Sequence, residues 1–175
     1  MDIQDLFKPK IVVALLSIII LLNLAALFLY TRIDTIVHVD LYSHGLQFSS
    51  EWALEYWSNY GFFLSSLASA AILVSTALFA FYIHNKDKDE LSRWMSILLT
   101  VIASGFIIFS VYFLFNIDWI VHHSLYQYGL QFNPEWAEGY WGITRATLAL
   151  TVIAASFSIG TAIITWSTTG IKRKN

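Results

Sequence analysis

The sequence predicts an all-α integral membrane protein, a four-helix bundle built by tandem duplication of one long helical hairpin. Two observations lead to this prediction. The chain has 175 residues, of which 57% are hydrophobic and only 13% are charged, about half the charged share of an ordinary soluble domain. In addition, a 25-residue segment at 33–57 recurs at 117–141, 84 positions later.

Four uncharged runs mark the expected membrane spans: 11–31, 56–83, 94–117 and 146–171. Each exceeds the roughly 20 residues that a helix needs to cross a hydrocarbon core of about 30 Å at 1.5 Å per residue. A helix satisfies its own backbone hydrogen bonds in lipid. We therefore expect four spanning helices in contact with the lipid bilayer. The first run is too long for the apolar part of a secretory signal and is expected to be retained.

The placement of basic residues predicts the orientation. One side of the runs carries Lys8, Lys10, Lys86, Lys88, Arg93, Lys172, Arg173 and Lys174, whereas the other side carries Arg32 and Arg145. Basic residues are enriched on the cytoplasmic side of membrane proteins. The prediction is a multi-pass cell-membrane protein with both termini and the 84–93 loop in the cytoplasm. Segments 32–57 and 116–145 would then be extracytoplasmic.

The repeated segment reads IDTIVHVDLYSHGLQFSSEWALEYW in its first copy and IDWIVHHSLYQYGLQFNPEWAEGYW in its second, with 16 of 25 positions identical. Both copies start on the same side of the membrane. A parallel duplication of this kind predicts two hairpins, 1–88 and 89–175, related by a pseudo-twofold axis along the membrane normal.

The turns inside the two copies have recognisable signals. Gly45 and Gly129 are suited to ending a helix, and Ser49 and Asn133 are suited to capping the next one. Pro134 falls at a first helical position, where its missing N–H costs nothing. Each helix should therefore run for about 35 residues, or about 50 Å, so that the hairpin tips protrude beyond the hydrocarbon core.

Aromatic residues gather where the helices re-enter the bilayer, namely Trp52, Tyr56, Trp57, Trp119, Trp136, Tyr140 and Trp141. We expect an interfacial aromatic belt. The alternative is a stacking site for a quinone or another flat ligand.

Both copies also retain the same ionisable residues. An Asp precedes a His by four positions, which places the two on one helix face, and a Glu begins the return helix. The candidate metal ligands are Asp34, His38, Glu51, Asp118, His122 and Glu135. Two His and four carboxylates suit a di-iron or di-manganese bundle site. One Asp and one His per hairpin with a third ligand would suit copper or zinc, and the remaining interpretation is a hydrogen-bonded network that stabilises the tip.

One local family resemblance rests on Asp118-Trp-Ile-Val-His122 followed by Phe132-Asn-Pro134-Glu-Trp136. These residues resemble the copper-ligand region of the C subunit of copper-dependent membrane monooxygenases, which oxidise methane or ammonia. The resemblance covers about 20 residues around Asp118 and His122. It implies that Asp118 and His122 would be copper ligands, with Glu135 where that family has a further His. The first copy lacks the Pro.

Three functions are consistent with these features. The first is a small structural or accessory subunit of a larger membrane complex, with other membrane subunits or further copies as partners. The second is a metal-binding redox subunit of a membrane oxidase or monooxygenase, with copper or iron as its cofactor. A transporter is less favoured, because the runs contain no charged residue and few Gly or Pro breaks. The absence of cysteine excludes disulfides and thiolate metal sites, and nothing indicates nucleic-acid binding.

Overall fold

The computed structural model describes residues 9–44, 50–128 and 134–171, and within these ranges the chain forms four α-helices. They are α1 (Pro9–His44), α2 (Ser50–Asp87), α3 (Glu90–Tyr128) and α4 (Pro134–Ile171). With 36 to 39 residues each, they are about 54 to 59 Å long. The predictions of an all-α bundle and of helices longer than the hydrocarbon core are confirmed.

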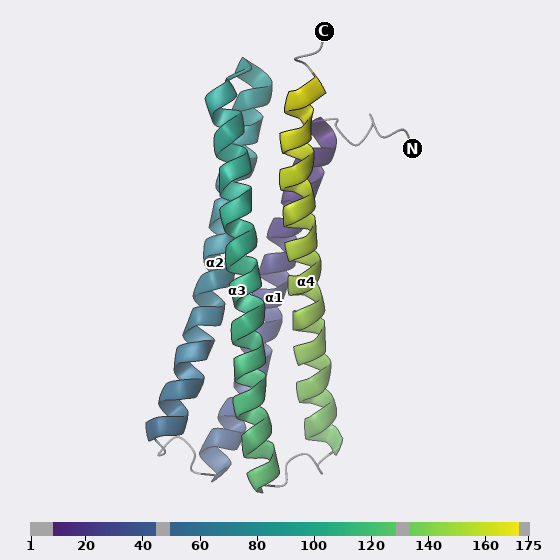
Figure 1. Ribbon diagram of the computed structural model, residues 1–175. Helices are drawn as coiled ribbons and strands as arrows, with labels where there is room; N and C mark the ends of the chain where they lie inside the picture. Colours follow the sequence, from purple (N-terminus) through teal and green to yellow (C-terminus); the bar gives the residue numbers. More distant parts are fainter. Residues whose placement is uncertain (1–8, 45–49, 129–133, 172–175) are drawn as a thin grey trace.

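The helices run alternately up and down and form a closed ring. Each contacts both of its neighbours, and α4 returns to pack against α1. The most extensive packing joins α2 and α3, which connects the first hairpin to the second. Figure 1 shows the start of α1, the end of α4 and the α2–α3 turn at one end of the bundle, and the end of α1, the start of α2, the end of α3 and the start of α4 at the other, which we call the tip end.

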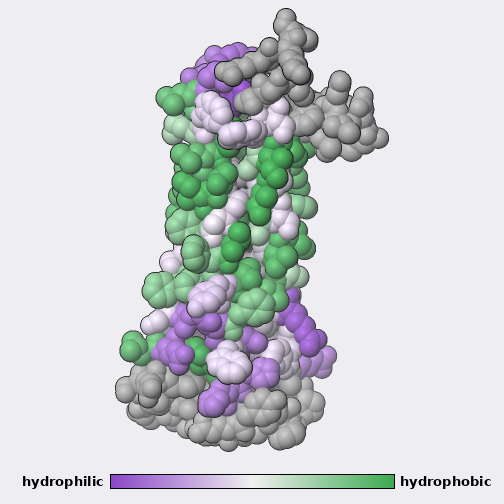
Figure 2. All heavy atoms as spheres, viewed as in Figure 1, coloured by the Kyte–Doolittle hydropathy of each residue, from purple (hydrophilic) through white to green (hydrophobic). Residues whose placement is uncertain are grey.

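All four helices contain a stretch long and apolar enough to cross a membrane: Pro9–Val37, Leu54–Asp87, Glu90–His123 and Glu138–Ser167. Figure 2 shows hydrophobic side chains gathered around the middle of the bundle and hydrophilic ones toward both ends. The chain is therefore a multi-pass membrane protein in contact with lipid. Its orientation stays a prediction.

The buried side chains follow a regular spacing. Along α1 the buried positions are 12, 16, 19, 23, 26, 30, 33 and 37, and along α4 they are 140, 144, 147, 151, 154, 158, 161 and 165, with Ala162 as one addition to the series. Successive positions differ alternately by four and three residues. This mean period of 3.5 is that of a left-handed bundle with interdigitating side chains.

A polar layer divides the apolar core. One cluster of buried apolar residues lies toward the α2–α3 turn and the other lies toward the tips. Between them α1 contributes Asn23, α3 contributes Ser110, and α4 contributes Thr147 and Thr151, all nearly fully buried. The three hydroxyls donate to carbonyl oxygens of their own helices. Neither the amide nitrogen nor the amide oxygen of Asn23 has a hydrogen-bond partner within the described ranges of the chain.

Small buried residues allow α2 and α3 to approach each other closely. Ala70 and Ala71 of α2 and Ala103 of α3 are buried. Ser96 Oγ of α3 donates to the carbonyl oxygen of Ala77 in α2 (2.9 Å). Close backbone approach and interhelical hydrogen bonds are the main sources of helix association in lipid.

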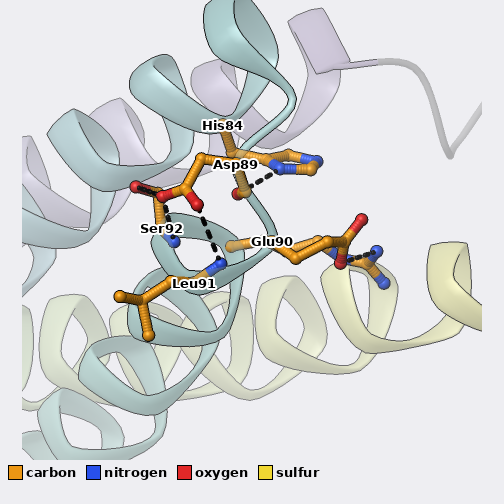
Figure 3. A network of polar contacts seen from close by, with 6 residues as sticks. His84, Asp89, Glu90, Leu91 and Ser92 are labelled. Carbon is orange, nitrogen blue, oxygen red and sulfur yellow. Dashed lines mark hydrogen bonds and ion pairs between the residues drawn. The ribbon is translucent and has the colours of Figure 1, made fainter.

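The α2–α3 turn consists of two residues (Figure 3). Lys88 adopts a left-handed backbone conformation, with φ of 57°. The Asp89 carboxylate caps α3, because it accepts hydrogen bonds from the backbone N–H of Leu91 (3.3 Å) and of Ser92 (2.9 Å) and from the Ser92 hydroxyl. His84 Nδ1 donates to the Asp89 carbonyl oxygen (2.8 Å), which joins the end of α2 to the start of α3.

The Asp89 cap depends on pH. The Ser92 hydroxyl and backbone N–H stabilise the charged carboxylate and hold the pKa of Asp89 below its ordinary value. A carboxyl group whose pKa is lower in the folded state than in the unfolded state stabilises the fold at pH values above its unfolded pKa of about 3.9. That contribution is lost as the pH falls through the folded-state pKa.

The left-handed conformation of Lys88 gives a first testable prediction. Lys88→Gly should stabilise the protein by up to about 1 kcal/mol, because glycine adopts this conformation without a steric penalty. The free energy of unfolding in mixed detergent micelles is the measurement. Lys86→Gly is the matched control, since it removes the same charge within α2 and should cost about 1 kcal/mol. Destabilisation by both substitutions would contradict the left-handed assignment.

Candidate functional site

Near the tips, one Asp–Tyr hydrogen bond joins the two helices of each hairpin, and the two bonds are equivalent. Tyr56 Oη donates to Asp34 Oδ1 (3.1 Å), and Tyr140 Oη donates to Asp118 Oδ1 (3.0 Å). Both pairs occupy equivalent positions of the repeated segment. The tyrosine side chains are 0% and 1% exposed. Asp34 and Asp118, which recur at equivalent positions, therefore each bind a buried tyrosine across their own hairpin.

The prediction of an aromatic belt is wrong for Tyr56 and Tyr140. Both rings lie in the tip-side apolar cluster, because the alternating spacing turns them toward the bundle axis. Trp57 and Trp119 do face outward, at 37% and 75% exposure. Trp141 is partly buried and lies against the His122 ring, with 4.7 Å between ring centroids. The side chains of Trp52 and Trp136 lie outside the described residues.

Tightly packed aromatic rings surround the first pair. The Tyr30 ring lies 4.2 Å from that of Phe63 and 5.2 Å from that of Tyr60, measured between centroids. Next to this cluster, Asn116 Nδ2 of α3 donates to Asn59 Oδ1 of α2 (3.2 Å). This side of the bundle is therefore filled by rings and tied to the second hairpin by an amide pair.

The second pair, in contrast, borders two hollows that share Phe115 and Asp118. The larger one, of about 530 Å³, is lined among the described residues by Phe115, Asp118, Trp119, His122 and His123. The smaller one, of about 140 Å³, lies between α3 and α4, and its lining includes Leu114, Asp118, Trp141, Arg145 and Leu148. The Asp118 carboxylate thus borders both hollows at the end of the spans, with two imidazoles around the larger one and a guanidinium beside the smaller one.

Side-chain size explains this difference between the copies. Leu114 stands 84 positions after Tyr30, and Thr144 stands 84 positions after Tyr60. Both smaller residues line the smaller hollow, whereas the two tyrosine rings are in contact across the first hairpin. The space occupied by rings beside Asp34 is accordingly open beside Asp118.

The predicted metal ligands are only partly brought together. Asp118 and His122 line the same hollow, as expected from their spacing of four, while Asp34 lies with Tyr56 in the other hairpin. The side chains of His38, Glu51 and Glu135 lie outside the described residues. Among the side chains that the structure describes, no three His, Asp or Glu residues converge as a metal site would require. The metal assignment stays a prediction.

Sequence reasoning missed the tyrosines as partners of the acids. The available signal was their identity in both copies, 22 positions after each Asp. It also missed Arg145, which has Gly61 as its counterpart 84 positions earlier.

Comparison of the chain with protein-family models, curated proteins and solved structures gives no match.

The Asp–Tyr pairs give a second prediction. Tyr56→Phe and Tyr140→Phe should each destabilise the bundle by about 1 to 2 kcal/mol, because each removes a hydrogen bond that a buried hydroxyl donates to a carboxylate. The free energy of unfolding in detergent micelles would show this. Tyr82→Phe and Tyr112→Phe remove hydroxyls from side chains that are 60% and 58% exposed and should have little effect. Equal small effects for all four variants would contradict a stabilising role for the pairs.

Proposed function

We propose that the chain is a small accessory subunit of a larger membrane complex, and that α4 is the helix that contacts a partner. The observation that carries the proposal is that small residues predominate on the outward face of α4, namely Gly142, Ala146, Ala149, Ser156 and Gly160, with Ile153 and Ile163 as the large residues of the same row. Each lies two positions after a buried residue of α4 and so on the opposite side of the helix. Rows of small residues let a second transmembrane helix approach closely.

The outward face of α3 carries larger side chains than this face of α4. The outward side of α3 carries Phe106, Phe109, Tyr112 and Phe115, all substantially exposed, as is common for a lipid-facing surface. A Cβ atom built at Gly142 or Gly160 would meet nothing within 4 Å. Packing within the bundle therefore does not require a glycine at either position.

The polar residues near the tips support the same function. The carboxylates of Asp34 and Asp118 accept hydrogen bonds from buried tyrosines of their own hairpins. Asn59 and Asn116 form a further link between the hairpins. These contacts serve to hold four helices together, as expected of a structural subunit.

The third prediction tests the α4 surface. Replacing Gly142 and Gly160 together by Leu should remove the chain from its complex, because the leucines would keep a partner helix away. The control replaces Gly61 of α2 and Gly105 of α3 by Leu, where an added Cβ also meets nothing within 4 Å. The measurement is the amount of chain in the native assembly, by native gel and mass spectrometry after mild solubilisation.

Circular dichroism and thermal unfolding should show that both double variants keep the folded bundle. Equal assembly of the two variants would contradict a partner surface on α4. A wild-type chain that migrates alone after mild solubilisation would contradict the accessory function itself.

A metal-binding redox subunit is the second candidate. It is favoured by the presence of Asp118, His122 and His123 around one hollow. Carboxylate and imidazole groups suit copper, iron or zinc, and a bound metal would supply redox or Lewis-acid chemistry.

The fourth prediction separates the two candidates. If the acids are structural, metal bound per chain in the natively purified complex should be the same in wild type and in a variant with Asp34→Ala and Asp118→Ala. Elemental mass spectrometry is the measurement. Stoichiometric copper or iron that is lost in the variant would favour the redox subunit.

A further inference from the structure

The two hollows share Phe115 and Asp118 of α3, the smaller one lies between α3 and α4, and we call the two together the Asp118 groove. It lies where the uncharged runs of the two helices end and charged residues begin. That position corresponds to the boundary between hydrocarbon and headgroups of a bilayer. The groove is therefore positioned to contact the polar part of a lipid.

Two opposite charges line the groove without forming an ion pair. Arg145 and Asp118 both line the smaller hollow, yet no salt bridge between them is found within the described part of the chain. Tyr140 Oη donates to Asp118 Oδ1 and His122 lies near the same carboxylate, while Asp118 Oδ2 accepts no hydrogen bond from the residues that the structure describes. A ligand with a cation and an anion a few ångströms apart would satisfy both side chains.

The groove is amphipathic along the membrane normal. Leu114 and Leu148 lie about one helical turn closer to the middle of the membrane than Asp118 and Arg145, as their positions along α3 and α4 require. Phe115, at 57% exposure, lies at the outward side. Charged groups at the outer end and apolar groups at the inner end match a lipid that extends its chains into the bilayer.

We propose that the Asp118 groove binds a zwitterionic phospholipid with a primary ammonium headgroup, of the phosphatidylethanolamine type. The ammonium group donates hydrogen bonds to the Asp118 carboxylate, and the Arg145 guanidinium binds the phosphate. Charge-assisted hydrogen bonds of this kind are among the strongest available in proteins. The acyl chains lie along Leu114 and Leu148.

The charge pattern selects this headgroup over others. A choline headgroup has no N–H donor for Asp118, and a glycerol headgroup has no cation. A flat quinone could lie on Phe115 and Trp119, but it would leave both charges without a counter-ion. The hollow volumes of about 530 and 140 Å³ are in the range of sites for small molecules.

The fifth prediction tests the groove on the purified full-length chain by native mass spectrometry. Phosphatidylethanolamine, phosphatidylcholine and phosphatidylglycerol with identical acyl chains are added separately, and the bound fraction is measured. We expect the ethanolamine lipid to bind roughly tenfold more tightly than the choline lipid, as the loss of one charge-assisted hydrogen bond implies. Equal binding of the three lipids, or displacement of the ethanolamine lipid by a quinone, would overturn the proposal.

Three variants locate the binding. Asp118→Asn keeps an acceptor for Tyr140 and should abolish the preference for ethanolamine over choline. Arg145→Gln should weaken binding of all three lipids. Asp34→Asn is the matched control, because Asp34 forms the equivalent tyrosine hydrogen bond but has Gly61 where the second copy has Arg145. Its lipid preference should equal that of wild type, and an effect as large as that of Asp118→Asn would contradict the assignment.

Discussion

The alternating three- and four-residue spacing of buried side chains is the constraint on which the rest of the structure depends. In lipid, an apolar side chain gains little by moving from acyl chains into a protein core, so close packing and polar contacts must hold helices together. The spacing keeps one face of each helix toward the bundle axis over its whole length. Because neighbouring helices are antiparallel, it also decides which residues meet. Asp34 reaches Tyr56, and Asp118 reaches Tyr140, since each pair lies at matching heights on antiparallel helices.

Polar groups in this core are tolerated to different degrees. The buried hydroxyls of Thr147, Thr151 and Thr161 donate to carbonyl oxygens of the preceding turn and so need nothing from another helix. The Asn23 amide and the Tyr30 hydroxyl form no such bond within their own helix, and neither has a hydrogen-bond partner among the residues that the structure describes. An unsatisfied buried group costs about 1 to 3 kcal/mol. A single buried Asn can fix the alignment of packed helices at such a cost, and Asn23 stands between the two apolar clusters.

Much of the fold could be predicted from the sequence, because the deciding signals are local. Run length and charge placement require no knowledge of tertiary contacts, and they predicted four helices and their approximate extents. The turn at Lys88 and Asp89 could be located only approximately, since left-handed backbone at a lysine has no sequence signature. Tyr56 and Tyr140 were assigned to the membrane interface because aromatic residues at a span boundary usually lie there. Their burial depends on how α2 and α4 are rotated about their own axes. Each rotation is fixed by packing against the preceding helix of the same hairpin. For the same reason the spacing of Asp118 and His122 predicted their proximity, whereas the neighbouring hollow could not be foreseen.

The smaller hollow, between α3 and α4, arises from differences in side-chain size between the two hairpins. Where the first hairpin has Tyr30, Tyr60 and Gly61, the second has Leu114, Thr144 and Arg145. The loss of two rings opens space, and the added guanidinium places a positive charge beside it. A dry cavity of about 140 Å³ would cost about 3 kcal/mol at roughly 24 cal/mol per Å³. An opening toward the bilayer removes most of this cost, because a lipid can occupy the space. The three differences therefore make physical sense together: the first hairpin is filled by its own side chains, and the second is completed by a molecule from the membrane.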